Sequence, residues 1–161
     1  MKVGVISDTH DRLPTFRRAL ALFKRLEVDA LFHAGDFVAP FAAKLMSADH
    51  WTTPLYCVYG NNDGEREGLK AVLPGVTGGP LRVEIGGRII VMHHWIEQIP
   101  AARMEGVDVV ISGHTHAIVN EHQNGCLTLN PGECCGWITD RCTVAVLDLD
   151  ALTAEIIEVH D

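Results

Sequence analysis

The sequence lacks long hydrophobic runs and is short of positive charge. Its apolar stretches fall well below the ~20 residues that a membrane-spanning helix requires, so we expect no transmembrane segment and no membrane partner. Thirteen Lys and Arg stand against 21 Asp and Glu, which gives a formal net charge of −8. A charge of this sign opposes binding along a phosphate backbone. We therefore expect no extended nucleic acid as a partner.

The sequence also lacks a C-x-x-C zinc motif and a secretory leader. The apolar stretch after Met1 is too short for such a leader, so we expect the mature chain to start there. The five cysteines are consistent with reduced thiols of a cytoplasmic protein. Cys134 and Cys135 are also candidates for soft metal ligands, but adjacent side chains on extended backbone point to opposite sides.

A length of 161 residues is that of one domain, and no linker, repeat or low-complexity tract divides the chain. We therefore expect a single domain over residues 1–161. In the first half, β-branched apolar runs alternate with helical patterns, which indicates βαβ units and a partly parallel sheet. The expected strands cover residues 2–7, 29–32 and 54–59, and the expected helices cover residues 14–26 and 40–48.

The pattern changes after Leu73 to shorter strands separated by turns, so this half is expected to be more antiparallel. Gly86-Gly87 between two apolar runs predicts a tight hairpin. Residues 64–79 and 95–106 are expected to be loops. The expected strands cover residues 81–85, 88–92, 107–111, 126–130, 143–148 and 154–159.

Short polar clusters stand where hydrophobic runs end. Sites in open α/β sheets form outside the carboxyl ends of the strands, so these clusters are expected to converge. Asp8 and His10 are two residues apart and can face one side, as can His114 and His116. Asp36 follows Gly35 and is the natural bridge between two ions. The candidate metal ligands are Asp8, His10, Asp36, Asn61, His93, His114 and His116.

These motifs together resemble the signature of the calcineurin-like metallophosphoesterases. The motifs are Asp8-Thr9-His10, Gly35-Asp36, Gly60-Asn61-Asn62-Asp63, His93 and Gly113-His114-Thr115-His116. Residues 7–11, 60–66 (GNNDGER) and 130–136 (NPGECCG) are similar to the small single-domain prokaryotic phosphodiesterases of that superfamily. The resemblance runs from residue 4 to beyond residue 136.

The resemblance implies an α/β fold in which two mixed β-sheets pack as a sandwich flanked by helices, a four-layer arrangement. It implies one ion held by Asp8, His10, Asp36 and His116, and a second held by Asp36, Asn61, His93 and His114. The implied reaction is hydrolysis of a small phosphate ester, most simply a phosphodiester, by in-line attack of a metal-bound hydroxide.

The donor set agrees with this chemistry independently of the family. Two ions roughly 3.5 to 4 Å apart lower the pKa of a shared water, orient the phosphate and neutralise its charge. Imidazole, carboxylate and amide donors suit Mn, Fe, Co, Ni, Zn or Mg better than Ca, although affinity order alone does not choose among them. Manganese is our first expectation for both ions.

Two positions depart from the family pattern. Asn62 stands where many members have a histidine near the leaving group, and an amide cannot be a general acid at neutral pH. His93-His94-Trp95 replaces His-Gly-His. Asn62 and His94 are therefore candidate catalytic residues, with a structural role for His94 as the alternative. Asn62 and Trp95 are candidates for contact with the substrate.

Two further interpretations stay open. One is phosphomonoesterase activity. The other is a non-catalytic interaction scaffold of the same fold, as in a subunit of the retromer sorting complex whose metal site is degraded. A homo-oligomer is also compatible with the apolar loop residues.

Overall fold

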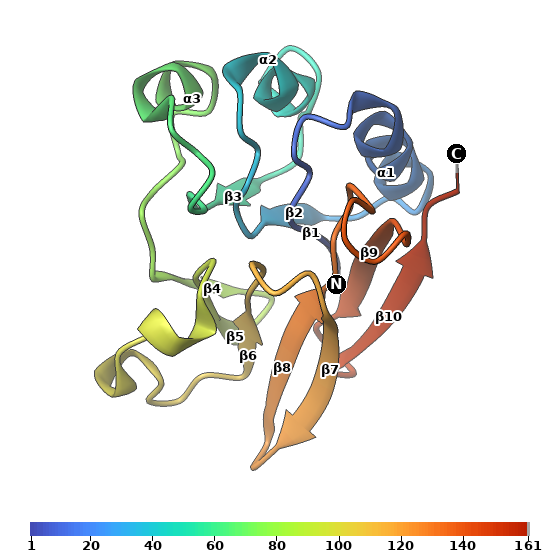
Figure 1. Ribbon diagram of the computed structural model, residues 1–161. Coiled ribbons are helices and arrows are strands. Elements are labelled where there is room, and N and C mark those ends of the chain that lie inside the picture. Colours follow the sequence, from blue (N-terminus) through green and yellow to red (C-terminus); the bar gives the residue numbers. More distant parts are fainter. Residues whose placement is uncertain (161) are drawn as a thin grey trace.

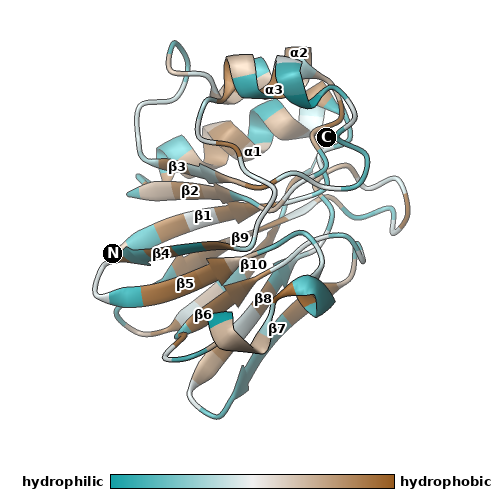
Figure 2. Ribbon diagram, turned by 90° about the vertical axis from the view of Figure 1, so that its left-hand side faces the viewer, coloured by the Kyte–Doolittle hydropathy of each residue, from teal (hydrophilic) through white to brown (hydrophobic). Residues whose placement is uncertain are grey.

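Two five-stranded mixed sheets pack face to face, with the α-helices covering the outer side of the first sheet (Figures 1 and 2). The computed structural model describes residues 1–160, and Asp161, the end of the expected domain, lies outside the described residues. The expected fold class, two mixed sheets packed as a sandwich, is confirmed. No helix within residues 1–160 is long and apolar enough to cross a membrane.

The first sheet has the order β10-β9-β1-β2-β3. Three neighbouring strands of this sheet are parallel: β1 (Lys2–Ile6), β2 (Ala30–His33) and, at the edge, β3 (Leu55–Cys57). The last two strands, β9 (Thr143–Asp148) and β10 (Thr153–Glu158), are antiparallel. This is the partly parallel sheet that the sequence predicts, closed by the end of the chain.

Helix α1 (Leu13–Arg25) begins with Pro14 in its first turn, where a missing N–H costs nothing. Phe16, Ala19, Leu20 and Phe23 recur at helical spacing and are buried against the first sheet. The second expected helix is shorter than predicted. It consists of α2 (Pro40–Ala43) followed by a single 3-10 turn, η1 (Lys44–Met46).

Helix α3 (Arg66–Val72) lies where the sequence analysis expected a loop. The helix is only seven residues long, and Leu69 is its one fully buried side chain. Such a short element presents too few apolar positions to establish a helical period, so the expectation of a loop there was wrong.

The second sheet has the order β4-β5-β6-β8-β7. The hairpin of β4 (Leu81–Ile85) and β5 (Arg88–Met92) is confirmed, with Gly86 and Gly87 both at positive φ. Strands β5, β6 (Val109–Ile111) and β8 (Cys126–Pro131) are parallel, so this half is less antiparallel than expected. Strand β7 (Ile118–Gln123) was not expected from the sequence. It is an antiparallel edge strand whose side chains are almost all exposed.

The core between the sheets is made of apolar side chains from the facing sides of both, among them Val5, Phe32, Met92 and Leu129. The outer face of the second sheet is covered more thinly. Val91 and Val110 pack there against Ile99, which lies between the 3-10 turns η2 (Ile96–Gln98) and η3 (Ala101–Arg103). The fourth layer of the expected sandwich is therefore formed by single turns and loop residues.

Candidate metal centre

The polar clusters that follow β1, β2, β3, β5 and β6 meet at the carboxyl ends of the parallel strands, as expected. Backbone hydrogen bonds tie these loops together. Within the first sheet the Asp8 N–H donates to the Gly35 carbonyl at 3.0 Å, and within the second the Gly113 N–H donates to the His94 carbonyl at 3.1 Å. The His114 N–H donates to Oδ2 of Asp8 at 3.2 Å and so joins loops of the two sheets.

The backbone is strained at these positions. Asp8, His10, Asp36, His114 and His116 all have positive φ, between 39° and 68°. Left-handed backbone is uncommon for residues other than glycine and costs roughly 1 to 3 kcal/mol at each position. Such strain persists only where surrounding contacts enforce it, and here it is concentrated on five of the candidate ligands.

Two glycines make the close approach of these loops feasible. A Cβ atom at Gly60 would lie 2.0 Å from Oδ1 of Asp36, and one at Gly113 would lie 2.8 Å from Oδ2 of Asp8. Any side chain at either position would push a candidate ligand out of place.

The first group of candidate ligands is formed by Asp8, His10 and His116. Nε2 of His116 lies 3.5 Å from Oδ1 of Asp8, and Nε2 of His10 lies 3.8 Å from the same oxygen. Oδ1 of Asp8 and Nε2 of His10 are both buried and have no hydrogen-bond partner among residues 1–160. Ligand atoms bound at about 2.1 Å to one ion lie roughly 3 Å apart at right angles and about 4.2 Å apart when opposite each other, so both gaps are within reach of a shared cation.

Glu133, in the loop after β8, orients this group. Its Oε2 lies 2.8 Å from Nδ1 of His116, and only a nitrogen that carries a proton can donate to a carboxylate, so Nε2 is left as the free donor to a metal. The carboxylate also accepts from the backbone N–H groups of Trp137, Ile138 and Thr139. Burial opposes ionisation of Glu133, but the hydrogen bonds it receives lower its pKa to about 2.

We expect Glu133→Gln to lower metal affinity and activity by about 10- to 100-fold, because partners that fix a histidine ligand typically contribute that much. A titration of the protein with metal, monitored by calorimetry, measures the affinity for the metal. Glu158→Gln, which removes a surface carboxylate paired with Arg141 at 3.3 Å, is the matched control. Unchanged affinity in Glu133→Gln would contradict the proposed orienting role.

The second group consists of Asp36, Asn61, His94 and His114. Nε2 of His94 lies 3.4 Å from Oδ2 of Asp36 and 3.0 Å from Oδ1 of Asn61. Nδ1 of His114 lies 2.9 Å from the same Asn61 oxygen. Oδ2 of Asp36 is also 3.5 Å from Nε2 of His10, which places this carboxylate between the two groups as expected.

The tautomer of His94 follows from its second contact. Nδ1 lies 2.7 Å from the Ala34 carbonyl, so it carries a proton. Nε2 faces two acceptor oxygens, one on Asn61 and one on Asp36, which either a second ring proton or a bound cation would satisfy. Burial lowers the pKa of His94, but its contact with Asp36 and the charges of Asp8 and Asp36 raise it overall. The group thus attracts a cation.

The structure does not bring His93, the expected ligand, into the cluster. The His93 N–H donates to the Ile111 carbonyl at 3.2 Å, so β5 continues one residue further and its side chains keep alternating. His94 therefore shares the inner face of the sheet with Met92. The ring of His93 lies against Gly79, and its Nδ1 accepts from the Trp95 N–H at 3.0 Å. Burial lowers its pKa.

The other candidate residues border the cluster. The side-chain amide of Asn62 donates to Oδ2 of Asp36 at 2.8 Å, and its backbone N–H donates to Oδ1 at 2.8 Å. The ring of Trp95 lies 4.9 Å from that of His94 and 5.2 Å from that of His114. Asp63 accepts backbone N–H groups of Asp36, Val38 and Gly60, which holds both loops together.

Sequence reasoning missed Glu133 at this site, although its place after a strand end, like that of the candidate ligands, was an available signal. Cys135, the weaker candidate for a soft ligand, lies beside the first group. Its Sγ is within 4.8 Å of ligand nitrogens of His10 and His116 and donates to Glu133 at 3.0 Å. Ligand atoms of Asp8, Asp36 and His94 also lie within 4.8 Å of one another.

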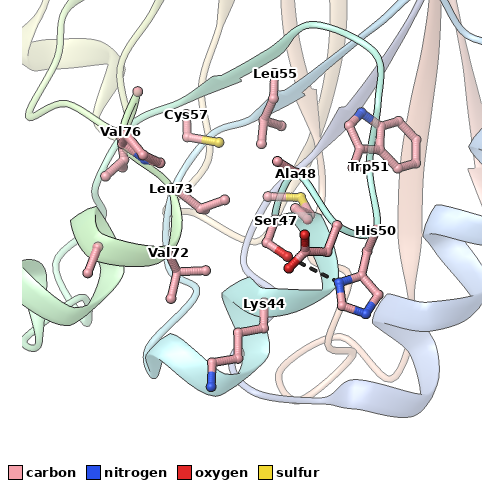
Figure 3. A pocket seen from close by; sticks show the side chains of 15 residues that line it. Lys44, Ser47, Ala48, His50, Trp51, Leu55, Cys57, Val72, Leu73 and Val76 are labelled. Carbon is pink, nitrogen blue, oxygen red and sulfur yellow. Dashed lines mark hydrogen bonds between the residues drawn. The ribbon is translucent and has the colours of Figure 1, made fainter.

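A cavity of about 650 Å³ lies elsewhere. It lies between α3 and the segment after α2, against β3, and none of its lining residues belongs to the cluster (Figure 3). Its wall is apolar, with Leu55, Leu73 and Val76, and a hydrogen bond of 3.1 Å joins Ser47 to His50 at its rim. The cluster itself is open to solvent, because His114 is exposed and His10 and His116 are half-buried.

Comparison with known proteins agrees with the site. The family model for the calcineurin-like phosphoesterase superfamily domain matches residues 1–152. A phosphodiesterase of Methanocaldococcus jannaschii is 39% identical over 158 residues, covering 93% of this chain and 94% of that protein. A probable metallophosphoesterase of Methanothermobacter thermautotrophicus is 33% identical, covering 98% of this chain and 92% of that protein.

The fold is also similar to that of a known phosphodiesterase structure. A solved structure described as a novel archaeal phosphodiesterase superposes with a TM-score of 0.89 at 36% identity, covering 98% of this chain and 99% of that one. Converging carboxylate, amide and imidazole acceptors, two of them buried without partners, are what a divalent cation would satisfy. The chain therefore belongs to the calcineurin-like phosphoesterase superfamily and is a metal-dependent phosphoester hydrolase.

Proposed function

We propose that this chain is a phosphodiesterase that hydrolyses small phosphodiesters with two divalent ions, manganese being the first choice. The observation that carries the proposal is the place of Asp36, whose Oδ2 lies 3.5 Å from His10 and 3.4 Å from His94, between two separate groups of donors. The relatives named or described as phosphodiesterases support the diester as substrate.

In this proposal Asp8, His10, Asp36 and His116 hold the first ion. Asp36, Asn61, His94 and His114 hold the second, so His94 takes the role first expected of His93. When bound, two such ions activate water, orient the phosphate and neutralise its charge. The chain supplies orientation: Glu133 and the Ala34 carbonyl fix the rings of His116 and His94, and Asn62 fixes the carboxylate of Asp36.

The test is reconstitution of chelator-stripped protein with Mn, Co, Ni, Fe, Zn or Mg in separate samples. Each sample is assayed with bis(4-nitrophenyl) phosphate and with 4-nitrophenyl phosphate. We expect restored activity with faster cleavage of the diester, and manganese to be among the best ions. Faster cleavage of the monoester would support a phosphomonoesterase instead. Metal binding without cleavage of either ester, or no metal binding, would support the scaffold.

Asn62 has a separate consequence. Its amide donates to Asp36 and has no proton to transfer, so the departing oxygen leaves largely unprotonated unless another group helps. We expect the rate to depend steeply on leaving-group pKa across aryl phosphodiesters. Asn62→His should then accelerate the poorest leaving groups most. A shallow dependence in the original protein, or equal gains for all esters, would contradict this.

Further features belong to the same proposal. The apolar core that spans both sheets supports a single domain over residues 1–161. All five cysteines are thiols outside any disulfide, which suits a cytoplasmic location. The net charge of −8 supports a small substrate over extended nucleic acid. A small homo-oligomer is proposed from the exposed apolar residues, which include Phe41 and Ile138.

A further inference from the structure

Trp137 is an exposed aromatic residue that is nonetheless held in place. Its side chain is 61% exposed, yet its indole N–H donates to the His10 carbonyl at 3.4 Å. Its backbone N–H donates to Glu133 at 3.0 Å, and the Arg12 guanidinium lies 4.8 Å from the centre of its ring. An exposed tryptophan normally needs no such fixation. Here the large apolar surface is preorganised, which lowers the entropic cost of binding.

The contacts of Trp137 connect it to the first group of ligands. Glu133, which holds the Trp137 backbone, also holds His116 at 2.8 Å. The indole reaches the backbone of His10 itself, and the guanidinium of Arg12 donates to the Cys135 carbonyl at 2.5 Å. The indole therefore stands beside the first group, with Arg12 fixing the loop that carries it.

Trp95 stands on the other side of the centre. Its ring lies near His94 and His114 of the second group. A phosphate at the centre would thus have an aromatic surface toward each group of candidate ligands. Asn62, where the leaving group is expected, directly follows Asn61 of the second group, which leaves the first side for the substituent that stays on the phosphate.

We infer that Trp137 is a stacking platform for a flat aromatic substituent on the retained side of the substrate, an aryl group or a nucleobase. The inference rests on the proposed phosphodiesterase function and specifies its substrate class. Every aromatic ring or base can stack on an indole, and the charge of Arg12 below the ring is compatible with this. The platform favours diesters with an aromatic retained group over diesters with a small alkyl group.

The kinetic test compares two diesters with the same leaving group, bis(4-nitrophenyl) phosphate and methyl 4-nitrophenyl phosphate. Trp137→Ala removes one stacking interaction. From the free energy of such an interaction we expect kcat/KM for the first ester to fall by about 5- to 100-fold, mainly through a higher KM. We expect the methyl ester to change by less than about twofold and Trp137→Phe to restore most of the loss. Ile138→Ala is the control, because it removes 73%-exposed apolar surface from the same loop without removing a ring. Equal losses for both esters would overturn the inference.

A binding measurement separates this inference from the proposed function. The chain has three tryptophans, so nitrogen-15 spectra show three indole N–H signals, and Trp137→Phe identifies one of them. In protein loaded with diamagnetic Mg²⁺, diphenyl phosphate should shift the Trp137 signal and leave that of buried Trp51 unchanged. If the Trp137 signal does not shift, Trp137 is not a stacking platform, even if diesters are cleaved. A shift without any cleavage would support the platform and refute the phosphodiesterase.

Discussion

Replacement of Asp36 by asparagine is expected to lower phosphodiesterase activity by at least about 10³-fold and to release bound metal. Asp36 is 1% exposed and lies against His10, Asn62 and His94. Burial opposes its ionisation, but the contacts with His94 and Asn62 lower its pKa well below the usual range. An asparagine would present at most one neutral oxygen to two ions. Its amide nitrogen, which is a hydrogen-bond donor, would face other hydrogen-bond donors.

The control for this substitution is Asp49→Asn, which removes the same charge from an exposed position at the rim of the remote cavity. Its activity should stay within about twofold. The metal-free Asp36→Asn protein should melt somewhat lower than the unmodified one, because the contacts that lower the pKa of Asp36 stabilise its charged form in the folded protein and are weakened by the neutral amide. Added Mn²⁺ should raise the Tm of the unmodified protein by roughly 5 to 10 °C and that of the variant far less. Retained activity would remove Asp36 from its bridging role.

Alanine replacements of the two adjacent histidines are expected to differ greatly. His94→Ala should lose the second ion and at least about 10²-fold in activity, because Nε2 of His94 is one of the donors around Asn61 and Asp36. His93→Ala should retain the second ion and lose less than about tenfold, because the His93 ring packs against Gly79 outside the cluster.

Metal content by mass spectrometry and activity measured on the same samples check this pair. Both side chains are buried, so each variant also needs a melting curve to establish that it folds. His94→Gln is a milder second variant, since it keeps polar atoms near the Ala34 carbonyl. If His93→Ala released the metal and His94→Ala did not, the second ligand set would return to the one first expected from the family pattern.

The site could be predicted largely from the sequence because most of its ligands follow strand ends. Asp8, Asp36 and Asn61 come after parallel strands of one sheet, and His114 after a parallel strand of the other, so topology alone brings them together. The choice between His93 and His94 could not be made this way. It depends on whether β5 ends before or after His93, and a shift of one residue turns every side chain to the other face.

The remaining differences concern elements with little apolar signal. β7 has almost no buried side chain, and α3 has one fully buried residue, so neither shows a period in the sequence. Both are held by their neighbours, β7 by its pairing with β8 and α3 by its packing beside α2. Glu133 was missed because its role depends on a contact with His116, 17 residues away.

Anomalous diffraction from crystals grown with Mn²⁺ tests the central claim most directly. The account predicts two peaks that share Asp36, one beside Asp8, His10 and His116 and the other beside Asn61, His94 and His114. A single peak, or a second peak bound by His93 with His94 turned away, would contradict it.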